Sequence, residues 1–235
     1  MHFNIMTLFP ELFPGPLSAS ITGKAHDKNI WSYSTINIRD FATDNYRSVD
    51  YTPFGGGAGM VMRADILESA FLSLSTTSCP PSGRRLFLSP RGTPLTQKIV
   101  QELTQEESLT LLCGRYEGID QRFLDVYQFE EISIGDYILA GGEIPALALM
   151  EACIRLLPGA VGNAQTPVEE SFSQDLLEYP QYTKPADWIA RDGISHRVPD
   201  ILRSGDHKKI KQWRESEALS VTRKNRPDLL YNDEI

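Results

Sequence analysis

The sequence predicts an α/β protein with a mostly parallel sheet, followed by a small helical C-terminal domain. Through the first 160 residues, short apolar runs alternate with segments of helical periodicity. Such alternation is typical of a parallel sheet covered by helices on both faces. The pattern changes after Pro158-Gly159, where residues 160–174 are polar, small and acidic. We therefore expect an α/β domain over 1–159, a linker over 160–174 and a helical domain over 175–235.

Five segments have the composition of strands. Residues 3–9 are largely apolar, and residues 31–38 are rich in β-branched and aromatic side chains. Residues 86–89 and 109–113 are short and almost wholly apolar, as expected for parallel strands buried on both faces. A further strand is expected within residues 126–134.

Three helices are expected in the α/β domain. Residues 64–74 place apolar side chains at 66, 67, 70, 71 and 74, which is the stripe of an amphipathic helix. A second helix is expected over residues 96–103. A third, over residues 145–157, follows Gly141-Gly142 and has Pro145 in its first turn, where the missing N–H costs nothing.

The C-terminal part is expected to contain a basic helix, in contrast to the acidic segment that precedes it. Residues 206–224 are compatible with a helix that has Asp206 as its N-cap and Trp213 as a packing side chain. The net charge is −8, yet residues 203–226 hold 8 basic and 3 acidic residues, while residues 101–182 hold 3 basic and 15 acidic ones. Because the local field steers a ligand, such a tail can bind a polyanion.

Several protein classes are disfavoured by composition. The three cysteines, Cys79, Cys113 and Cys153, are widely spaced, which argues against a disulfide framework or a zinc site. The N-terminus lacks the basic leader of a signal peptide. No run of roughly 20 apolar residues, the length that spans a bilayer, is present. We expect a cytoplasmic protein that does not use a membrane.

Three glycine-containing loops are candidates for a ligand site. Residues 53–60 (PFGGGAGM) match neither a dinucleotide fingerprint nor a Walker loop. Residues 113–120 and 133–143 lie next to predicted strand ends, where open α/β sheets bind ligands, and their mixture of glycine, tyrosine and carboxylate suits a nucleoside. The alternative is a pair of tight turns with Tyr116 and Tyr137 packed on the surface.

The motifs LSPRG (88–92), CGRYEGID (113–120) and SIGDYILAGGE (133–143) together closely resemble the bacterial tRNA (guanine-N1)-methyltransferases of the SPOUT superfamily. The resemblance extends over nearly the whole chain through RSVDYTPFGGGAGM (47–60), IRLLPG (154–159), EESF (169–172) and SGDHKKIKQWR (204–214). It implies a trefoil-knotted α/β domain that binds S-adenosylmethionine (SAM). It also implies an obligate homodimer with active sites at the subunit interface, and a C-terminal domain that holds tRNA. The product would be 1-methylguanine at tRNA position 37, next to the anticodon.

The resemblance assigns a SAM pocket to residues of the three motifs. No metal ligand is assigned, although Mg²⁺ is a further candidate cofactor. The expected SAM-binding residues are Leu88, Ser89, Pro90, Gly114, Tyr116, Glu117, Ile134, Gly135, Tyr137, Leu139, Gly141 and Gly142.

Two further groups are required by the chemistry. Guanine N1 carries a proton at neutral pH, so methylation needs a base, and the charge that develops on O6 needs a cation or donor. By resemblance, Arg155 is the cation at O6. Glu170 stands where the family typically has Asp, and is our candidate base, with Glu169 as the alternative.

Substrate contacts are also expected by resemblance. Asp50 and the glycine loop with Gly56 and Gly57 would lie near the target base. Candidate tRNA phosphate contacts are Lys208, Lys209 and Arg214, with Lys211, Arg223, Lys224 and Arg226 as further members. A solvated helix face would look the same in sequence.

Three alternative functions stay open at this point. One is another enzyme of the superfamily that acts on a ribose hydroxyl or on ribosomal RNA. Another is a dimer that binds SAM or RNA without turnover. The last is a generic α/β nucleotide-binding protein whose basic tail is merely solvated.

Overall fold

The computed structural model describes residues 1–76, 82–161, 171–172 and 175–231. The chain divides into two compact units, Met1–Ala164 and Gln165–Ile235. Their boundary falls inside residues 160–174, for which we predict a linker, and most of that segment lies outside the described residues. The two units are described separately below.

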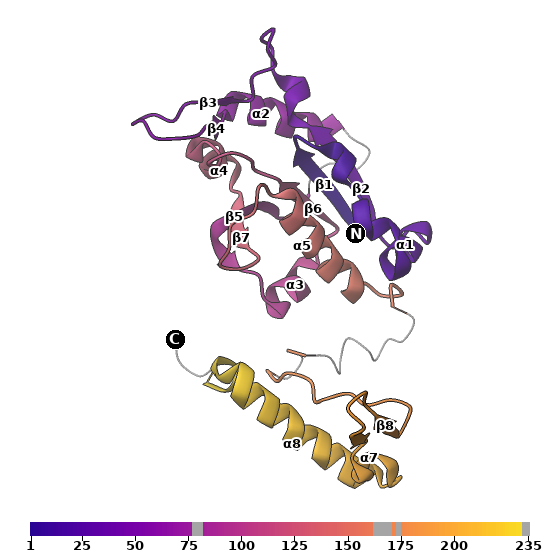
Figure 1. The fold of residues 1–235 in the computed structure, drawn as a ribbon. Coiled ribbons are helices and arrows are strands. Elements are labelled where there is room, and N and C mark those ends of the chain that lie inside the picture. The colour runs from indigo at the N-terminus through magenta and orange to yellow at the C-terminus, as the bar shows by residue number, and fades with distance from the viewer. Residues whose placement is uncertain (77–81, 162–170, 173–174, 232–235) are drawn as a thin grey trace. The chain divides into compact units, whose positions relative to one another are not determined.

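The N-terminal unit is built on one five-stranded sheet. Its strands are β1 (His2–Thr7), β2 (Ser32–Asn37), β5 (Arg85–Pro94), β6 (Ser108–Leu112) and β7 (Glu130–Ser133). They lie in the order β2-β1-β6-β5-β7, and every pairing is parallel. The predicted α/β fold with a mostly parallel sheet is therefore confirmed (Figure 1).

Strand burial follows the apolar pattern. All five residues of β6 are buried, as expected for a central strand covered on both faces. The predicted strand at 86–89 is too short, because β5 continues to Pro94 and pairs with β7 again after an irregularity between Leu88 and Thr93. That irregularity falls on the motif at 88–92.

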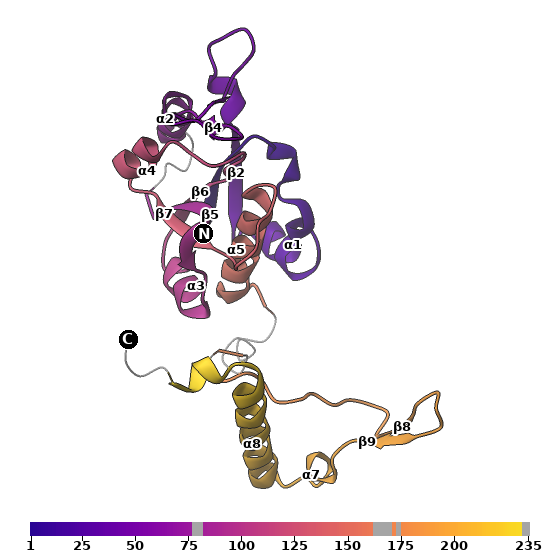
Figure 2. The ribbon, with the colours of Figure 1, turned by 60° about the vertical axis from the view of Figure 1, so that its left-hand side comes forward.

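Helices cover both faces of this sheet. The helices α1 (Ser20–Asp27), α3 (Gln97–Leu103) and α5 (Glu143–Leu156) enclose one apolar core, and α2 (Ala64–Ser73) and α4 (Gln121–Tyr127) enclose the other. Figure 2 shows α2 and α4 together on one side of the strands and α1 and α5 on the other. The predicted stripe of α2 is buried at all five positions.

Short elements complete the unit. The strands β3 (Asp50–Tyr51) and β4 (Val61–Met62) form an antiparallel hairpin around the glycine loop. Single 3₁₀ turns span Pro10–Leu12, Gly15–Ser18, Ile38–Phe41 and Leu74–Thr76.

The C-terminal unit contains α7 (Asp200–Arg203), the long helix α8 (His207–Asn225) and a 3₁₀ turn, Pro227–Tyr231. Asp206 is the N-cap of α8, as predicted, and its carboxylate accepts the Lys209 N–H at 3.1 Å. The unit also contains a hairpin that we did not predict, β8 (Asp187–Ile189) with β9 (Ser195–Arg197). Its turn contains Asp192-Gly193, with Gly193 at a φ of +83°, which is a common hairpin signal. None of the described helices is long and apolar enough to cross a membrane.

Candidate active site

Three loops meet at the carboxyl ends of β5, β6 and β7. These strands are neighbours in the sheet, so the segments that follow Leu88, Leu112 and Ser133 converge at one edge. They enclose a cavity of about 410 Å³. This is the position at which α/β sheets usually bind ligands.

The cavity brings together all twelve residues that the resemblance assigns to the cofactor. Residues 88–90, 114–117 and 134–142 supply most of the wall. Tyr116 and Tyr137 are half exposed and line this cavity, so they are not packed away on a remote surface. Lining residues that sequence reasoning did not name are Phe87, Arg91, Arg115, Gly118, Ile119, Ile132, Ser133, Ile138, Ala140 and Pro145.

Gly142 holds two of the cavity loops against each other. Its N–H donates to the carbonyl of Gly114 at 2.9 Å. A Cβ at this position would lie only 2.7 Å from the Cα of Cys113. Because the neighbour is backbone, nothing there can move aside cheaply, and only glycine fits.

A buried charged group lies behind the cavity wall. Glu143 is the first residue of α5 and is 1% exposed. Its Oε1 accepts a hydrogen bond from the Thr7 hydroxyl at 2.8 Å, and its Oε2 lies 2.9 Å from Nη2 of Arg115. The second contact is an ion pair without hydrogen-bond alignment. A carboxylate in the first turn of a helix is also favoured by the helix dipole.

Arg115 extends this group into the cavity wall. Its Nη1 donates to the carbonyl of Ala140 at 3.1 Å, and its guanidinium lies over the ring of Phe9 at 4.3 Å. Arg115 therefore ties the loop after β6 to the loop before α5. Sequence reasoning missed this group, and the only signal was an acidic residue placed directly after Gly141-Gly142.

The described cysteines are unreactive core residues. Burial, followed by the nearby charge of Glu143, raises the pKa of the Cys113 thiol well above its ordinary value. Burial raises the pKa of Cys153 to about 12. Both thiols are neutral near pH 7, which makes nucleophilic catalysis by either one unfavourable. Cys79 lies outside the described residues.

The β3–β4 hairpin is joined to a cavity loop. The Met62 N–H donates to the carbonyl of Gly118, and the Glu117 N–H donates to the carbonyl of Met60, each at 2.9 Å. Asp50 lies at the base of the hairpin. Gly56 and Gly57 lie in its open loop, and none of these three predicted substrate contacts lines the cavity.

The predicted catalytic arginine is not brought to the cavity of its own chain. Arg155 is exposed in the last turn of α5 and does not line the cavity. The cavity touches α5 at Pro145, and ten residues of helix correspond to about 15 Å. Glu170 and Glu169 lie outside the described residues.

The predicted phosphate contacts lie on α8, except Arg226, which is the C-cap of this helix. Lys209 is ion-paired with Asp206 at 3.3 Å, and the Arg214 guanidinium lies 4.9 Å from the centre of the Tyr179 ring. Lys208 is exposed. Among the residues that the structure describes, no cluster of three or more His, Cys, Asp or Glu side chains is arranged to hold a metal ion.

A parallel α/β sheet with a glycine-rich cavity at its carboxyl edge is the arrangement in which open α/β proteins commonly bind nucleotide-like ligands. The model of one family, described as "tRNA (Guanine-1)-methyltransferase TrmD", matches residues 1–232. The chain therefore belongs to the tRNA (guanine-1)-methyltransferase family.

Individual relatives agree with this assignment, and each is named a tRNA (guanine-N(1)-)-methyltransferase. The protein of Rhodospirillum rubrum is 52% identical over 225 residues, which is 96% of this chain and 90% of the relative. That of Nitrobacter winogradskyi is 52% identical over 226 residues, 96% of this chain and 91% of the relative. That of Ehrlichia canis is 48% identical over 230 residues, 97% of this chain and 95% of the relative.

Proposed function

We propose that this chain transfers a methyl group from SAM to N1 of the guanine at position 37 of tRNA, next to the anticodon. The observation that carries the proposal is the single cavity lined by all twelve motif residues in a chain of this family. We expect the loops that line it to be threaded as a trefoil knot. We also expect the enzyme to work in the cytoplasm, where tRNA is modified.

The cavity fits the proposed cofactor. Its volume of about 410 Å³ is within the usual range for small-molecule sites. Adenine is flat and weakly polar, so loop backbone and the rings of Tyr116 and Tyr137 are suitable partners. Glu117 contributes a carboxylate to the wall and is compatible with a positively charged ligand. When bound, SAM supplies a methyl group activated by a sulfonium.

Side chains of this protein then remove the proton of the guanine and stabilise the charge that develops on it. Glu170 removes the proton from guanine N1, and Glu169 is the alternative base. Arg155 stabilises the negative charge that develops on O6. A glutamate is one bond longer than the aspartate typical of the family, so the backbone around residue 170 must place the carboxylate accordingly.

The position of Arg155 supports an active site shared between two subunits. Since Arg155 is about 15 Å along α5 from the cavity of its own chain, a second copy is the natural source of this cation. A homodimer with two such sites satisfies this requirement by symmetry.

The proposed function is tested with labelled SAM and two tRNA transcripts that carry G or A at position 37. We expect 1-methylguanine from the G transcript alone, in assays run with and without Mg²⁺. Label in both transcripts would indicate a different target atom or site, as in the ribose or ribosomal RNA alternative. SAM binding without label in either transcript would indicate a binding protein.

Two variants test the catalytic roles. Glu170→Gln and Arg155→Ala should each abolish most turnover and leave SAM affinity nearly unchanged. Near-full activity of Glu170→Gln would move the role of base to Glu169.

Subunit mixing tests the shared site. An equal mixture of Arg155→Ala and Gly142→Val chains should recover roughly a quarter of wild-type activity, because half of the dimers are mixed and each holds one complete site. No recovery after confirmed exchange would place Arg155 and the cavity in the same subunit.

A further inference from the structure

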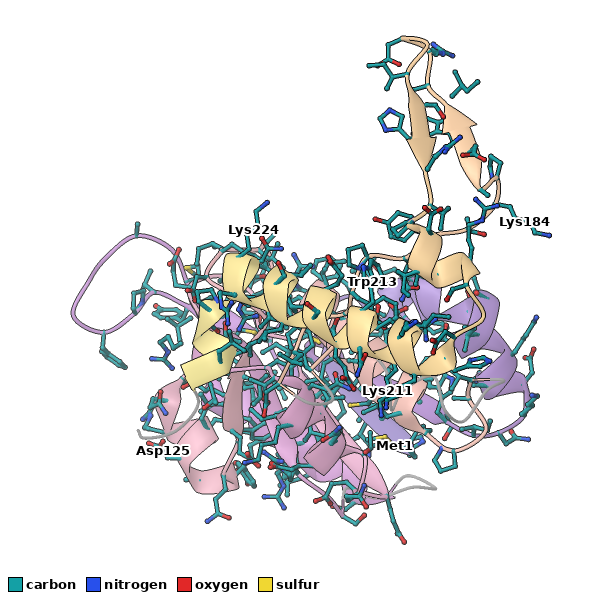
Figure 3. All side chains as sticks on the ribbon, turned by 90° about the horizontal axis from the view of Figure 1, so that it is seen from below. Met1, Asp125, Lys184, Lys211, Trp213 and Lys224 are labelled. Carbon is teal, nitrogen blue, oxygen red and sulfur yellow. The ribbon has the colours of Figure 1, made fainter. Side chains whose placement is uncertain are left out.

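The C-terminal unit contains a second large hollow, which we name the basic groove. It has a volume of about 970 Å³ and lies between the extended segment 176–186 and the helices α7 and α8. Its floor is apolar and includes Leu202, Ile210 and Ala218. Figure 3 shows Lys184 near the base of the projecting β8–β9 hairpin, and Trp213 and Lys211 on α8.

Basic side chains enter this groove from three separate segments. Lys184 comes from the extended segment, Arg203 from the end of α7, and Lys211 and Arg214 from α8. The carboxylates in the lining are Glu178 and Glu215, and Glu215 lies 3.8 Å from Lys211. Lys184 and Arg203 are exposed and have no ion-pair partner among the described residues. The groove therefore presents uncompensated positive charge.

Aromatic rings lie beside these charges. Tyr179 and Tyr182 pack around Trp213, with ring centres 6.4 and 6.2 Å from the indole. Arg214 covers Tyr179, whereas Tyr182 is 48% exposed and lines the groove. An exposed ring held by a second ring is a rigid platform on which a nucleobase can stack.

Other lysines of α8 are arranged differently. Lys208 and Lys209 do not line the groove, and Lys209 is compensated by Asp206. Sequence alone does not separate them from Lys211 and Arg214. The chain thus contains an internal control, since Lys208 and Lys209 carry the same charge on the same helix outside the groove.

We propose that the basic groove binds a single-stranded segment of the tRNA, with phosphates on Lys184 and Arg203 and one unstacked base on Tyr182. The combination of unpaired cations and an exposed ring favours RNA over an acidic peptide, which needs no stacking surface. This inference rests on the proposed function, in which tRNA is the substrate. It identifies the groove, rather than the whole basic face of α8, as the main RNA contact of this unit.

The test measures tRNA affinity of the full-length protein against salt concentration. Lys184→Gln/Arg203→Gln is compared with Lys208→Gln/Lys209→Gln, which removes the same number of charges. Loss of two phosphate contacts should lower the slope of log K against log salt by between roughly 1.4 and 1.8 in the groove variant. The control should change it little, and SAM affinity should stay unchanged in both.

Tyr182 provides an independent measurement. Tyr182→Ala should weaken tRNA binding about fivefold or more, as expected for loss of one stacked base, and Tyr182→Phe should restore it. Equal salt slopes for both double variants, or Tyr182→Ala binding like the wild type, would overturn the groove assignment. Competition by poly-glutamate as strong as that by tRNA would overturn it in favour of an acidic protein.

Failure of this inference is distinguishable from failure of the proposed function. Methylation of the G37 transcript by the wild-type enzyme, together with equal slopes for the two double variants, would reject the groove and keep the function. Absence of 1-methylguanine with the wild-type enzyme would reject the function itself.

Discussion

The two units of this chain differ in how they are packed. The N-terminal unit buries two apolar clusters, one on each face of its sheet. In the described part of the C-terminal unit, Ala218 and Thr222 are the only buried side chains. The first unit can hold a cavity in one shape before any ligand arrives, because close-packed cores resist deformation. The second has little core with which to do so.

The C-terminal unit is therefore ordered by a few contacts within itself. The Leu177 N–H donates to the Thr222 hydroxyl at 2.8 Å, and that hydroxyl donates to the carbonyl of Ala218 at 2.7 Å. The Tyr179–Trp213–Tyr182 cluster adds partly buried aromatic surface. A small unit with so little burial is marginal alone, and a partner that binds its folded form stabilises it. From this difference we predict that the proposed cofactor cavity is preformed, while the C-terminal unit, for which we propose RNA binding, gains order from its substrate.

The largest expected effect comes from a substitution that disturbs the cavity of the N-terminal unit. In Gly142→Val, the added side chain meets the Cys113 backbone, and the two loops must separate. A displacement on the order of 1 Å in an active site costs about 100-fold in rate, so we expect turnover and SAM binding to be lost. Calorimetric titration with SAM measures the affinity.

Ala148→Val is the matched control, because Ala148 is exposed on the same helix. It should bind SAM like the wild type. Normal SAM affinity in Gly142→Val would show that the cavity is not the cofactor site.

A second prediction concerns the charged group behind the cavity. Glu143→Gln removes the charge that compensates Arg115 and should lower the free energy of unfolding of the N-terminal unit by on the order of 3 kcal/mol. Arg115 would also lose its fixed orientation toward Ala140, so KM for SAM should rise more than kcat falls. Unfolding followed with denaturant, combined with steady-state kinetics, checks both effects. If Glu143→Gln kept both the wild-type KM for SAM and the wild-type free energy of unfolding, Glu143 would not act on the cavity.

The C-terminal unit should respond independently. Trp213→Ala should lower its local stability by roughly 2 kcal/mol, below the value for a fully buried tryptophan, and leave SAM affinity unchanged. Trp188→Ala is the control, because Trp188 is 58% exposed and, among the described residues, its one contact with another aromatic ring is with His196. Hydrogen exchange of residues 176–222 should accelerate in the first variant only. Weakened SAM binding in Trp213→Ala would contradict the independence of the two units.

The smallest expected effect is a pH dependence from the core of the N-terminal unit. The pKa of Cys153 is raised from 9.0 to about 12 by burial, so the folded state keeps a proton that the unfolded state loses. Its stabilising contribution is complete below pH 9 and is lost as pH rises from 9 toward 12. One pH unit into this window costs about 1.4 kcal/mol. The free energy of unfolding, measured between pH 8 and 10.5, should fall less steeply with pH in Cys153→Ala than in the wild type. Identical slopes for the two proteins would show that Cys153 is not the source of the pH dependence.

Local patterns were sufficient to predict much of the fold. The apolar runs at β1, β2 and β6 and the buried stripe of α2 follow from side-chain periodicity, which depends on neighbours in sequence. The helix α4 escaped prediction because only Phe123 and Leu124 of its residues are buried, and because its last two residues fall within 126–134, where we expected a strand.

The site was only partly predictable, for a different physical reason. The motifs identified the cavity loops, but the contact of Glu143 with Thr7 joins residues 136 positions apart and leaves no local pattern. The remoteness of Arg155 from the cavity likewise depends on the direction of α5 and not on its composition. Glu170 remains a prediction, since it lies outside the described residues.

Hydrogen exchange on the full-length enzyme, alone, with SAM and with tRNA, tests most directly the claim that one unit is preformed and the other is ordered by substrate. SAM should slow exchange in residues 88–92, 113–120 and 133–142 and leave residues 176–226 unchanged. Transfer RNA should slow exchange strongly in 176–226. The claim would be contradicted if residues 176–226 exchanged as slowly as the sheet before any tRNA was added, or if SAM alone protected them.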